Sequence, residues 1–293
     1  MSNEPAVPQG MRGRISSMAA LLVGVVVAVV AAISSAQDSP VVTLHEWRSF
    51  SPGAWKRVRV LRETFDDKGH PVNRTTAETT TTLVEIDENG LKLRAEVSVE
   101  VAGRRFAPQP QEVWYGFQGQ TKGQVAETSR LGTEKIELNG QKFDAQVCQV
   151  LVRDGKLERT SRLYCVEEFP HVLRRQSVLL DLSGEQPKEL DRLTSELVAW
   201  NLPYPYDREL LSVAMIRTVA VRPDGKTVTI ELQSPEVPGY VVAHWSTRWD
   251  AAGRIVERSV LELLDFDTGA DAARAPAGPL RRPLLHRSRP LRP

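Results

Sequence analysis

Apolar and polar residues alternate strictly along much of the chain. In LKLRAEVSVEV, apolar side chains occupy every second position from Leu91 to Val101, and charged or hydroxyl side chains lie between them. A period of two predicts a strand with one buried and one solvated face. This pattern is typical of antiparallel sheets, because strands of parallel sheets are commonly buried on both faces.

The same alternation recurs in segments that are separated by turn sequences. Asn89-Gly90, Asn139-Gly140, Asp154-Gly155 and Asp224-Gly225 tolerate the positive φ of tight turns and therefore mark strand reversals. The pattern predicts a chain of about ten strands, joined mainly as hairpins. The clearest further strands cover residues 55–65, 75–86, 210–223, 226–233, 240–250 and 254–266, and residues 146–165 form a hairpin.

The periodicity changes once, in PKELDRLTSELVAW. Apolar residues recur there at spacings of three and four, at Leu190, Leu193, Leu197 and Trp200. This spacing predicts one amphipathic helix that packs on the sheet, with Pro187 in its first turn. Residues 201–206, NLPYPY, are then expected to form a rigid loop. The predicted fold class is α+β, with antiparallel hairpins in a curved sheet or half-barrel and one main helix.

The first 36 residues have the features of an export segment. Arg12 and Arg14 precede an uncharged apolar run from Met18 to Ile33, and small residues follow up to Ala36. This order predicts an apolar helix that is either a signal peptide cleaved after Ala36 or a retained membrane anchor. In both cases the rest of the chain is expected in the periplasm, on the extracytoplasmic face of the membrane, or secreted.

Charge is distributed unevenly between the body and the C-terminal tail. Residues 1–36 and 270–293 together hold eight basic and two acidic residues, so the totals of 38 and 37 leave 30 against 35, or −5, for residues 37–269. An acidic body argues against nucleic acid as a partner. The tail, residues 270–293, is rich in proline and arginine and is expected to be disordered, either solvated or in contact with an acidic surface.

The order of features resembles a known class of envelope protein. A tryptophan-containing entry, Glu46-Trp47 and Pro52-Gly53-Ala54-Trp55, is followed by serial hairpins and the expected helix. Over about residues 43–266 this arrangement resembles the half-open β-barrel envelope proteins of the lipoprotein-carrier type. The resemblance implies a cavity that binds a lipid or another apolar ligand. It rests on arrangement alone, so it assigns no ligand-binding residue.

Catalytic motifs are absent from the sequence. His45-Glu46 lacks the second histidine of a zinc-protease helix, and no nucleophile elbow surrounds Ser246. We therefore predict no catalytic, cofactor-binding or metal-binding residues and no cofactor. Two aromatic groups are expected to fill the core or to line a ligand pocket. The first group is Tyr240, Trp245 and Trp249, and the second is Trp114, Tyr115 and Phe117. The five histidines are scattered along the chain, at His45, His70, His171, His244 and His286.

Two functions agree with these features. The first is a non-catalytic binding or carrier module of the cell envelope that holds an apolar ligand. The second is a structural or protein-interaction module without a small-molecule ligand. The region 37–269 forms either one β-rich domain or two lobes, residues 43–182 and 187–268. The sequence leaves the oligomeric state open, and a membrane tether depends on whether the N-terminal segment is retained.

Both cysteines, Cys148 and Cys165, lie in the predicted hairpin. If Asp154-Gly155 is a two-residue turn, Cys148 faces Ser161 and Cys165 faces Asp144. The two thiols then share an apolar face but are staggered by about 13 Å, beyond the roughly 7 Å between Cα atoms that a disulfide tolerates. A bridge would require a longer loop. We interpret the cysteines as core residues, since two thiolates alone do not complete a metal site.

Overall fold

The structure is a computed structural model that describes residues 45–101, 103–167 and 169–269. These residues form strands and turns, and no helix occurs among them. The strands are β1 (Trp55–Phe65), β2 (Pro71–Ile86), β3 (Gly90–Val101), β4 (Arg104–Phe106), β5 (Gln111–Gly116), β6 (Val125–Leu138), β7 (Gln141–Asp154), β8 (Leu157–Cys165), β9 (Arg174–Asp181), β10 (Lys188–Tyr206), β11 (Glu209–Arg222), β12 (Gly225–Gln233), β13 (Val241–Asp250) and β14 (Ile255–Asp267).

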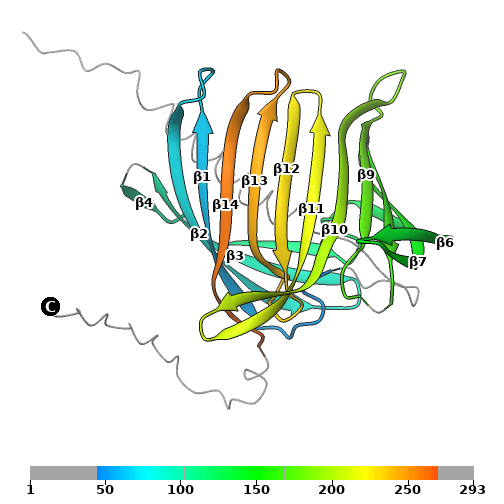
Figure 1. The fold of residues 1–293 in the computed structure, drawn as a ribbon, viewed down its shortest axis with the longest axis horizontal. Helices are drawn as coiled ribbons and strands as arrows, with labels where there is room; N and C mark the ends of the chain where they lie inside the picture. Colours follow the sequence, from blue (N-terminus) through cyan, green and yellow to red (C-terminus); the bar gives the residue numbers. More distant parts are fainter. Residues whose placement is uncertain (1–44, 102, 168, 270–293) are drawn as a thin grey trace, which may run out of the picture.

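All fourteen strands belong to one antiparallel sheet, in the order β4-β3-β2-β1-β14-β13-β12-β11-β10-β9-β8-β7-β6, with β5 paired to β3. Consecutive strands are neighbours from β1 to β4 and from β6 to β14, whereas β5 pairs with β3. In addition, β14 pairs with β1 and so joins the two ends of the described chain (Figure 1). The sheet is continuous from residues 174–181 to residues 188–206, because β9 pairs with β10. The expected antiparallel hairpins are confirmed, and β1 has the predicted bounds.

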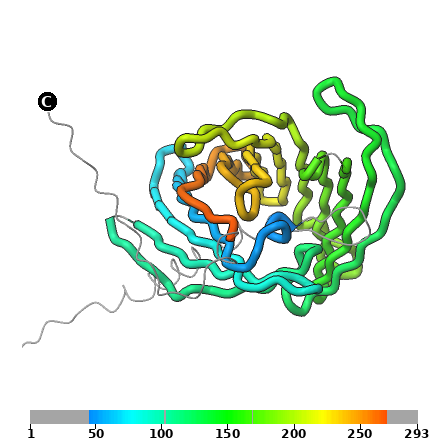
Figure 2. Tube along the Cα trace, turned by 90° about the horizontal axis from the view of Figure 1, so that it is seen from below, coloured from blue at the N-terminus to red at the C-terminus, as the bar shows by residue number. Residues whose placement is uncertain are grey.

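The sheet is strongly curled. In Figure 1, β10 to β14 stand beside β1 and β2, whereas β3 runs across behind them. Figure 2 shows the same chain end-on, with the segment that precedes β1 lying inside the curl. Backbone hydrogen bonds tie this segment to β2: Gly53 N donates to Leu83 O at 2.8 Å, and Leu83 N donates to Ala54 O at 2.8 Å. A buried cluster then secures it, formed by Trp47, Ala54, Leu83, Leu91, Leu93, Tyr115 and Phe117.

The predicted helix is wrong, and the α+β class with it. Residues 188–206 form β10, which pairs with β9 over Lys188–Glu196 and with β11 over Arg192–Tyr206. A spacing of four residues, as between Leu193 and Leu197, places two side chains on one face of a strand as well as of a helix. Pairing on both edges therefore decides the local structure.

The predicted rigid loop at residues 201–206 is also part of β10. Pro203 and Pro205 are compatible with a strand there because β9 ends its pairing at Glu196, which leaves one edge of β10 free. The register between β10 and β11 shifts around Ala199, and Asn201 has φ of 55°. Such irregularities bend a hairpin.

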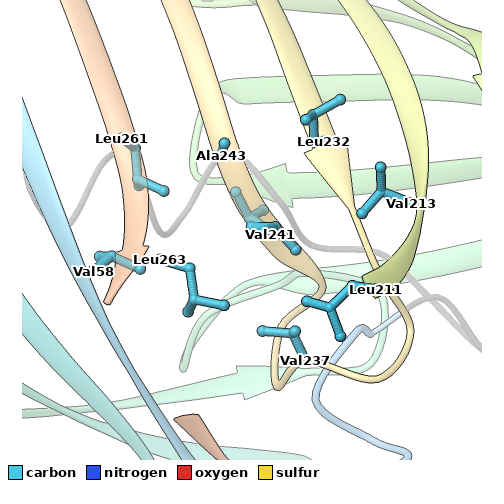
Figure 3. Close-up of a cluster of buried hydrophobic side chains, with 10 residues drawn as sticks. Val58, Leu211, Val213, Leu232, Val237, Val241, Ala243, Leu261 and Leu263 are labelled. Carbon is cyan, nitrogen blue, oxygen red and sulfur yellow. The ribbon is translucent and has the colours of Figure 1, made fainter. Parts of the chain in front are cut away.

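The bent end of the β10–β11 hairpin turns across the lower ends of β12 to β14 (Figure 1). Its side chains complete a core cluster with these strands. Figure 3 shows Leu211 and Val213 of β11 facing this region. The buried members are Val58, Leu211, Val213, Leu232, Val237, Val241, Val242, Ala243, Leu261 and Leu263.

Two adjacent leucines on β11 test the position of this core. Leu211 is 4% exposed, whereas Leu210 is 68% exposed. We expect Leu211→Ala to lower the free energy of unfolding by about 2–5 kcal/mol, because it removes apolar contacts and leaves a cavity. Leu210→Ala, the matched control, should change it by less than about 0.5 kcal/mol. Urea unfolding of both variants measures this, and equal losses would contradict the described packing.

Candidate ligand-binding site

A cavity of about 500 Å³ lies inside the curl of the sheet. Alternate residues of its strands line it, as the geometry of a strand requires. On β1 these are Lys56, Val58, Val60 and Arg62, and on β2 they are Thr75, Ala77, Thr79 and Thr81. Residues of β11 to β14 continue the lining, and the turn at residues 45–47 lies against the cavity as well.

The wall combines apolar and hydroxyl side chains with charged ones. Its apolar members include Val58, Val60, Ala77, Leu193, Ala220 and Leu261, and its hydroxyl members are Thr75, Thr79, Thr81, Thr218, Thr227, Thr229, Ser246 and Ser259. On β12 the polar face, Thr227, Thr229 and Glu231, faces the cavity. The cavity is therefore not a purely apolar pocket.

His45 is held in the cavity wall as a neutral ring. Trp47 N donates to His45 Nδ1 at 3.4 Å, so the ring hydrogen of the neutral form is on Nε2. Burial lowers the pKa of His45 to about 4, which keeps the ring neutral at physiological pH. His45 Nε2 is buried and has no hydrogen-bond partner among the described residues, and the same holds for Thr79 Oγ1.

Three charged side chains, Glu46, Lys56 and Glu231, line the end of the cavity that lies beside Trp47. This end is called the lower part of the cavity. Burial raises the pKa of Glu46 to about 8 and lowers the pKa of Lys56 to about 8. It also raises the pKa of Glu231, against the opposing effects of a hydrogen bond from Gln233 and the charge of Lys56. All three keep some accessible surface, and this surface faces the cavity. Lys56 Nζ donates to Gly239 O at 3.0 Å.

Further titratable groups surround this part of the cavity. Burial and the charge of Arg159 lower the pKa of Arg175 to about 10, opposed by the charge of Glu46. Burial, with a contribution from Lys56, lowers the pKa of His244 to about 4. His171 Nδ1 lies 3.3 Å from Gln233 Oε1. Desolvation dominates each shift, as expected for charges held away from bulk water.

The opposite end of the cavity carries paired charges. Arg62 and Glu257 form an ion pair, and Arg248 NH2 lies 3.5 Å from the same carboxylate. The Lys226 ammonium lies 5.3 Å from the centre of the Trp249 ring. Polar and aromatic groups therefore occupy both ends of the cavity, with small apolar and hydroxyl side chains between them.

The structure separates the residues that the sequence had grouped. His45 and His244 line the cavity, His171 is buried beside it, and His70 Nδ1 lies 3.5 Å from Asp66 in a turn. His286 lies outside the described residues. The aromatic residues differ in burial: Tyr115 and Phe117 are buried, whereas Trp245 is 45% exposed. Tyr115 and Trp249 line the cavity.

Glu46, Lys56 and Glu231 were not recognised as site residues from the sequence. A signal for Lys56 exists, because it occupies the same strand face as Val58 and Val60. A charged residue in register with apolar ones predicts either a buried charge or the end of the apolar face. Among the described residues, no cluster of histidine, cysteine or acidic side chains suits a metal ion. That part of the chain also contains no helix long and apolar enough to cross a membrane.

The two cysteines are buried free thiols on adjacent strands. Cys148 lies opposite Leu163 and Cys165 opposite Gln146, so the predicted partners, Ser161 and Asp144, are wrong by two residues. The reason is the turn, in which Asp154 pairs with Leu157 and Gly155-Lys156 are the central residues. A shift of two preserves the strand face, and Cys148 still shares its face with Leu163 and Cys165. Burial raises the pKa of Cys165 to about 12.

Neither a known protein family nor a curated protein matches the sequence. Two solved structures are similar in outline. One, described as a lipoprotein of Parabacteroides distasonis, is 10% identical with a TM-score of 0.31, over 73% of this chain and 96% of that protein. The other, described as an exported protein with a YmcC-like fold from Bacteroides fragilis, is 10% identical with a TM-score of 0.30, over 74% and 99%. At these TM-scores the likeness carries no statement about function.

Ionisation of Glu46 should destabilise the protein at alkaline pH. Because burial raises its pKa from 4.5 to about 8, the folded state disfavours the charged carboxylate, and stability is lost as the pH rises through this interval. Glu46→Gln cannot ionise. We expect it to unfold at the same free energy as wild type near pH 4.5 and to be more stable by on the order of 1 kcal/mol near pH 8.5. Urea unfolding at both pH values measures the difference.

Glu88→Gln, in the exposed turn between β2 and β3, is the matched control and should show no such pH dependence. A Glu46→Gln variant that is less stable than wild type near pH 8.5 would contradict the assignment of Glu46 to a desolvated site.

Both cysteines should be chemically inert in the folded protein. Burial raises the pKa of each thiol, so little thiolate forms near pH 8. We expect iodoacetamide to label neither cysteine before urea is added and both afterwards, as measured by intact mass. Dithiothreitol should leave the Tm unchanged. If iodoacetamide labels neither cysteine even after unfolding in urea without reductant, the two thiols are joined in a disulfide, and this would contradict the register.

Proposed function

We propose that the protein is a non-catalytic binding or carrier module that holds an amphipathic small molecule inside its curled sheet. The cavity is the observation that carries this proposal. Its volume of about 500 Å³ falls within the range of roughly 300–1,000 Å³ that small-molecule sites occupy. The lining contains apolar side chains that would contact a hydrocarbon part and a few convergent polar groups that would orient it.

The resemblance implied a lipid or another apolar ligand, and of these the lining favours an amphipathic one. An apolar ligand would leave His45 Nε2 and Thr79 Oγ1 without partners, and an unsatisfied buried polar group costs about 1–3 kcal/mol. A ligand with oxygen atoms would accept or donate these hydrogen bonds. The buried Glu46 and Lys56 likewise favour a ligand with a polar end.

The second candidate function is a protein-interaction module, and one feature of the surface favours it. Trp245 of β13 lies opposite Val260 of β14, and both side chains are exposed. Exposed neighbouring apolar residues often mark a docking surface. Trp245 is absent from the lining of the cavity, so this surface and the cavity would act independently. Export of the chain remains a prediction from residues 1–36, which lie outside the described residues.

Two adjacent residues of β11 give a test of cavity binding. Ala220 lines the cavity, whereas its neighbour Val219 lies on the opposite face of the strand. We expect wild type to bind the neutral dye Nile red, with increased fluorescence, and Ala220→Phe to weaken binding by about tenfold or more because the new ring fills the space. Val219→Phe is the matched control and should bind normally.

Solvent extraction of the purified protein followed by mass spectrometry would identify any ligand that co-purifies. No dye binding by wild type, together with a clean extract, would contradict the proposed function. A measured Tm close to that of wild type would show that Ala220→Phe is folded.

A further inference from the structure

The cavity is more positive than the body that surrounds it. Residues 37–269 carry a net charge of −5, yet the cavity lining contains five basic and four acidic side chains. The basic members are Lys56, Arg62, Arg222, Lys226 and Arg248, and the acidic ones are Glu46, Asp224, Glu231 and Glu257. A cavity whose lining has more basic than acidic side chains, inside an acidic body, has charge complementarity to an anionic ligand.

Two hydrogen-bond donors are available at the lower part of the cavity, around Trp47. His45 is 4% exposed, and its Nε2 carries a hydrogen but has no acceptor among the described residues. Lys56 Nζ has three N–H groups, and the Gly239 carbonyl is the one hydrogen-bond acceptor that the described residues offer it. Lys56 Nζ also lies 5.8 Å from the centre of the Trp47 ring.

Trp47 places both donors in the same part of the cavity. Its backbone N–H fixes the tautomer of His45, and its ring contacts Lys56. Trp47 itself is fixed by the buried cluster against β2, β3 and β5. Both donors are therefore positioned before a ligand arrives, so little ordering free energy is lost on binding.

We propose that this lower end of the cavity binds the carboxylate of a long-chain carboxylic acid, with Lys56 Nζ and His45 Nε2 donating to its oxygens. This inference rests on the proposed function and specifies the ligand class. The acyl chain lies along the wall formed by Val58, Val60 and Ala77. The lined part of β1, from Lys56 to Arg62, is about 20 Å long at roughly 3.3 Å per residue.

The charge of the two donors favours a single negative charge on the ligand. Lys56 carries one positive charge, whereas burial lowers the pKa of His45 to about 4 and keeps its ring neutral. The two donors therefore offer one positive charge, which disfavours a doubly charged phosphate ester. A ligand ammonium would instead meet Lys56 and the unpaired N–H of His45. A carboxylate matches both the donors and the local charge.

Three ligands of equal chain length test the inference on the full-length protein: dodecanoic acid, dodecanol and dodecyl phosphate, each titrated by calorimetry. We expect wild type to bind the acid about tenfold or more tightly than the alcohol, as a charge-assisted hydrogen bond provides. Lys56→Met should remove this preference while the alcohol binds as before. Lys56→Arg should keep it, and His45→Phe should reduce it.

Lys68→Met, in the exposed turn between β1 and β2 and outside the cavity lining, is the matched control and should retain the preference for the acid. Equal affinity of wild type for acid and alcohol, or a preference that survives in Lys56→Met, would overturn the carboxylate site but leave the proposed function intact. Tighter binding of dodecyl phosphate would also overturn it. If none of the three ligands binds, the carboxylate site is overturned, and the proposed function fails with it only if wild type also fails to bind Nile red and yields a clean extract. Thermal unfolding of each variant confirms that it is folded.

Discussion

The pairing of β14 with β1 is the contact on which the rest of the structure depends. It joins the two ends of the described chain through a ladder of backbone hydrogen bonds and makes one sheet of all the strands. With no helix among the described residues to cover it, the sheet shields its inner face by curling. The turn at residues 45–47 enters the curl and forms part of its lining.

Small side chains at inward positions explain why the curl contains a cavity. Thr, Ser, Ala and Val supply much of the inner wall, so opposite sides of the curled sheet do not meet. The same space permits charged groups inside, because Glu46 and Lys56 retain accessible surface toward the cavity. Their shifted pKa values record the cost of removing these charges from bulk water. A cavity with these groups is suited to binding a ligand that has both apolar and polar parts.

Local patterns predicted the strands well and failed where tertiary pairing overrode them. The turn at Asn139-Gly140 reverses the chain where expected, because both residues adopt the positive φ that this pair tolerates. The chain also reverses near Asp224-Gly225, but Arg222 pairs with Gly225, so Pro223 and Asp224 are the central residues of that turn. Leu193 and Leu197 were read as one face of a helix because a spacing of four fits both structures. Pairing of β10 with β9 and β11 decided between them. The turn after Cys148 reversed one residue later than expected, which moved both cysteines by two positions.

The sequence by itself determined that most of the body forms antiparallel strands, where the chain turns between most of them, and which residues share each face of a strand. These features depend on the backbone and on neighbouring side chains. Only the tertiary structure decided which face points inward. On β12 the polar set, Thr227, Thr229 and Glu231, lines the cavity, and alternation alone cannot distinguish this from its reverse. The binding site likewise required the fold, because Glu231 is remote in sequence from His45 and Lys56 and joins them only when the sheet curls.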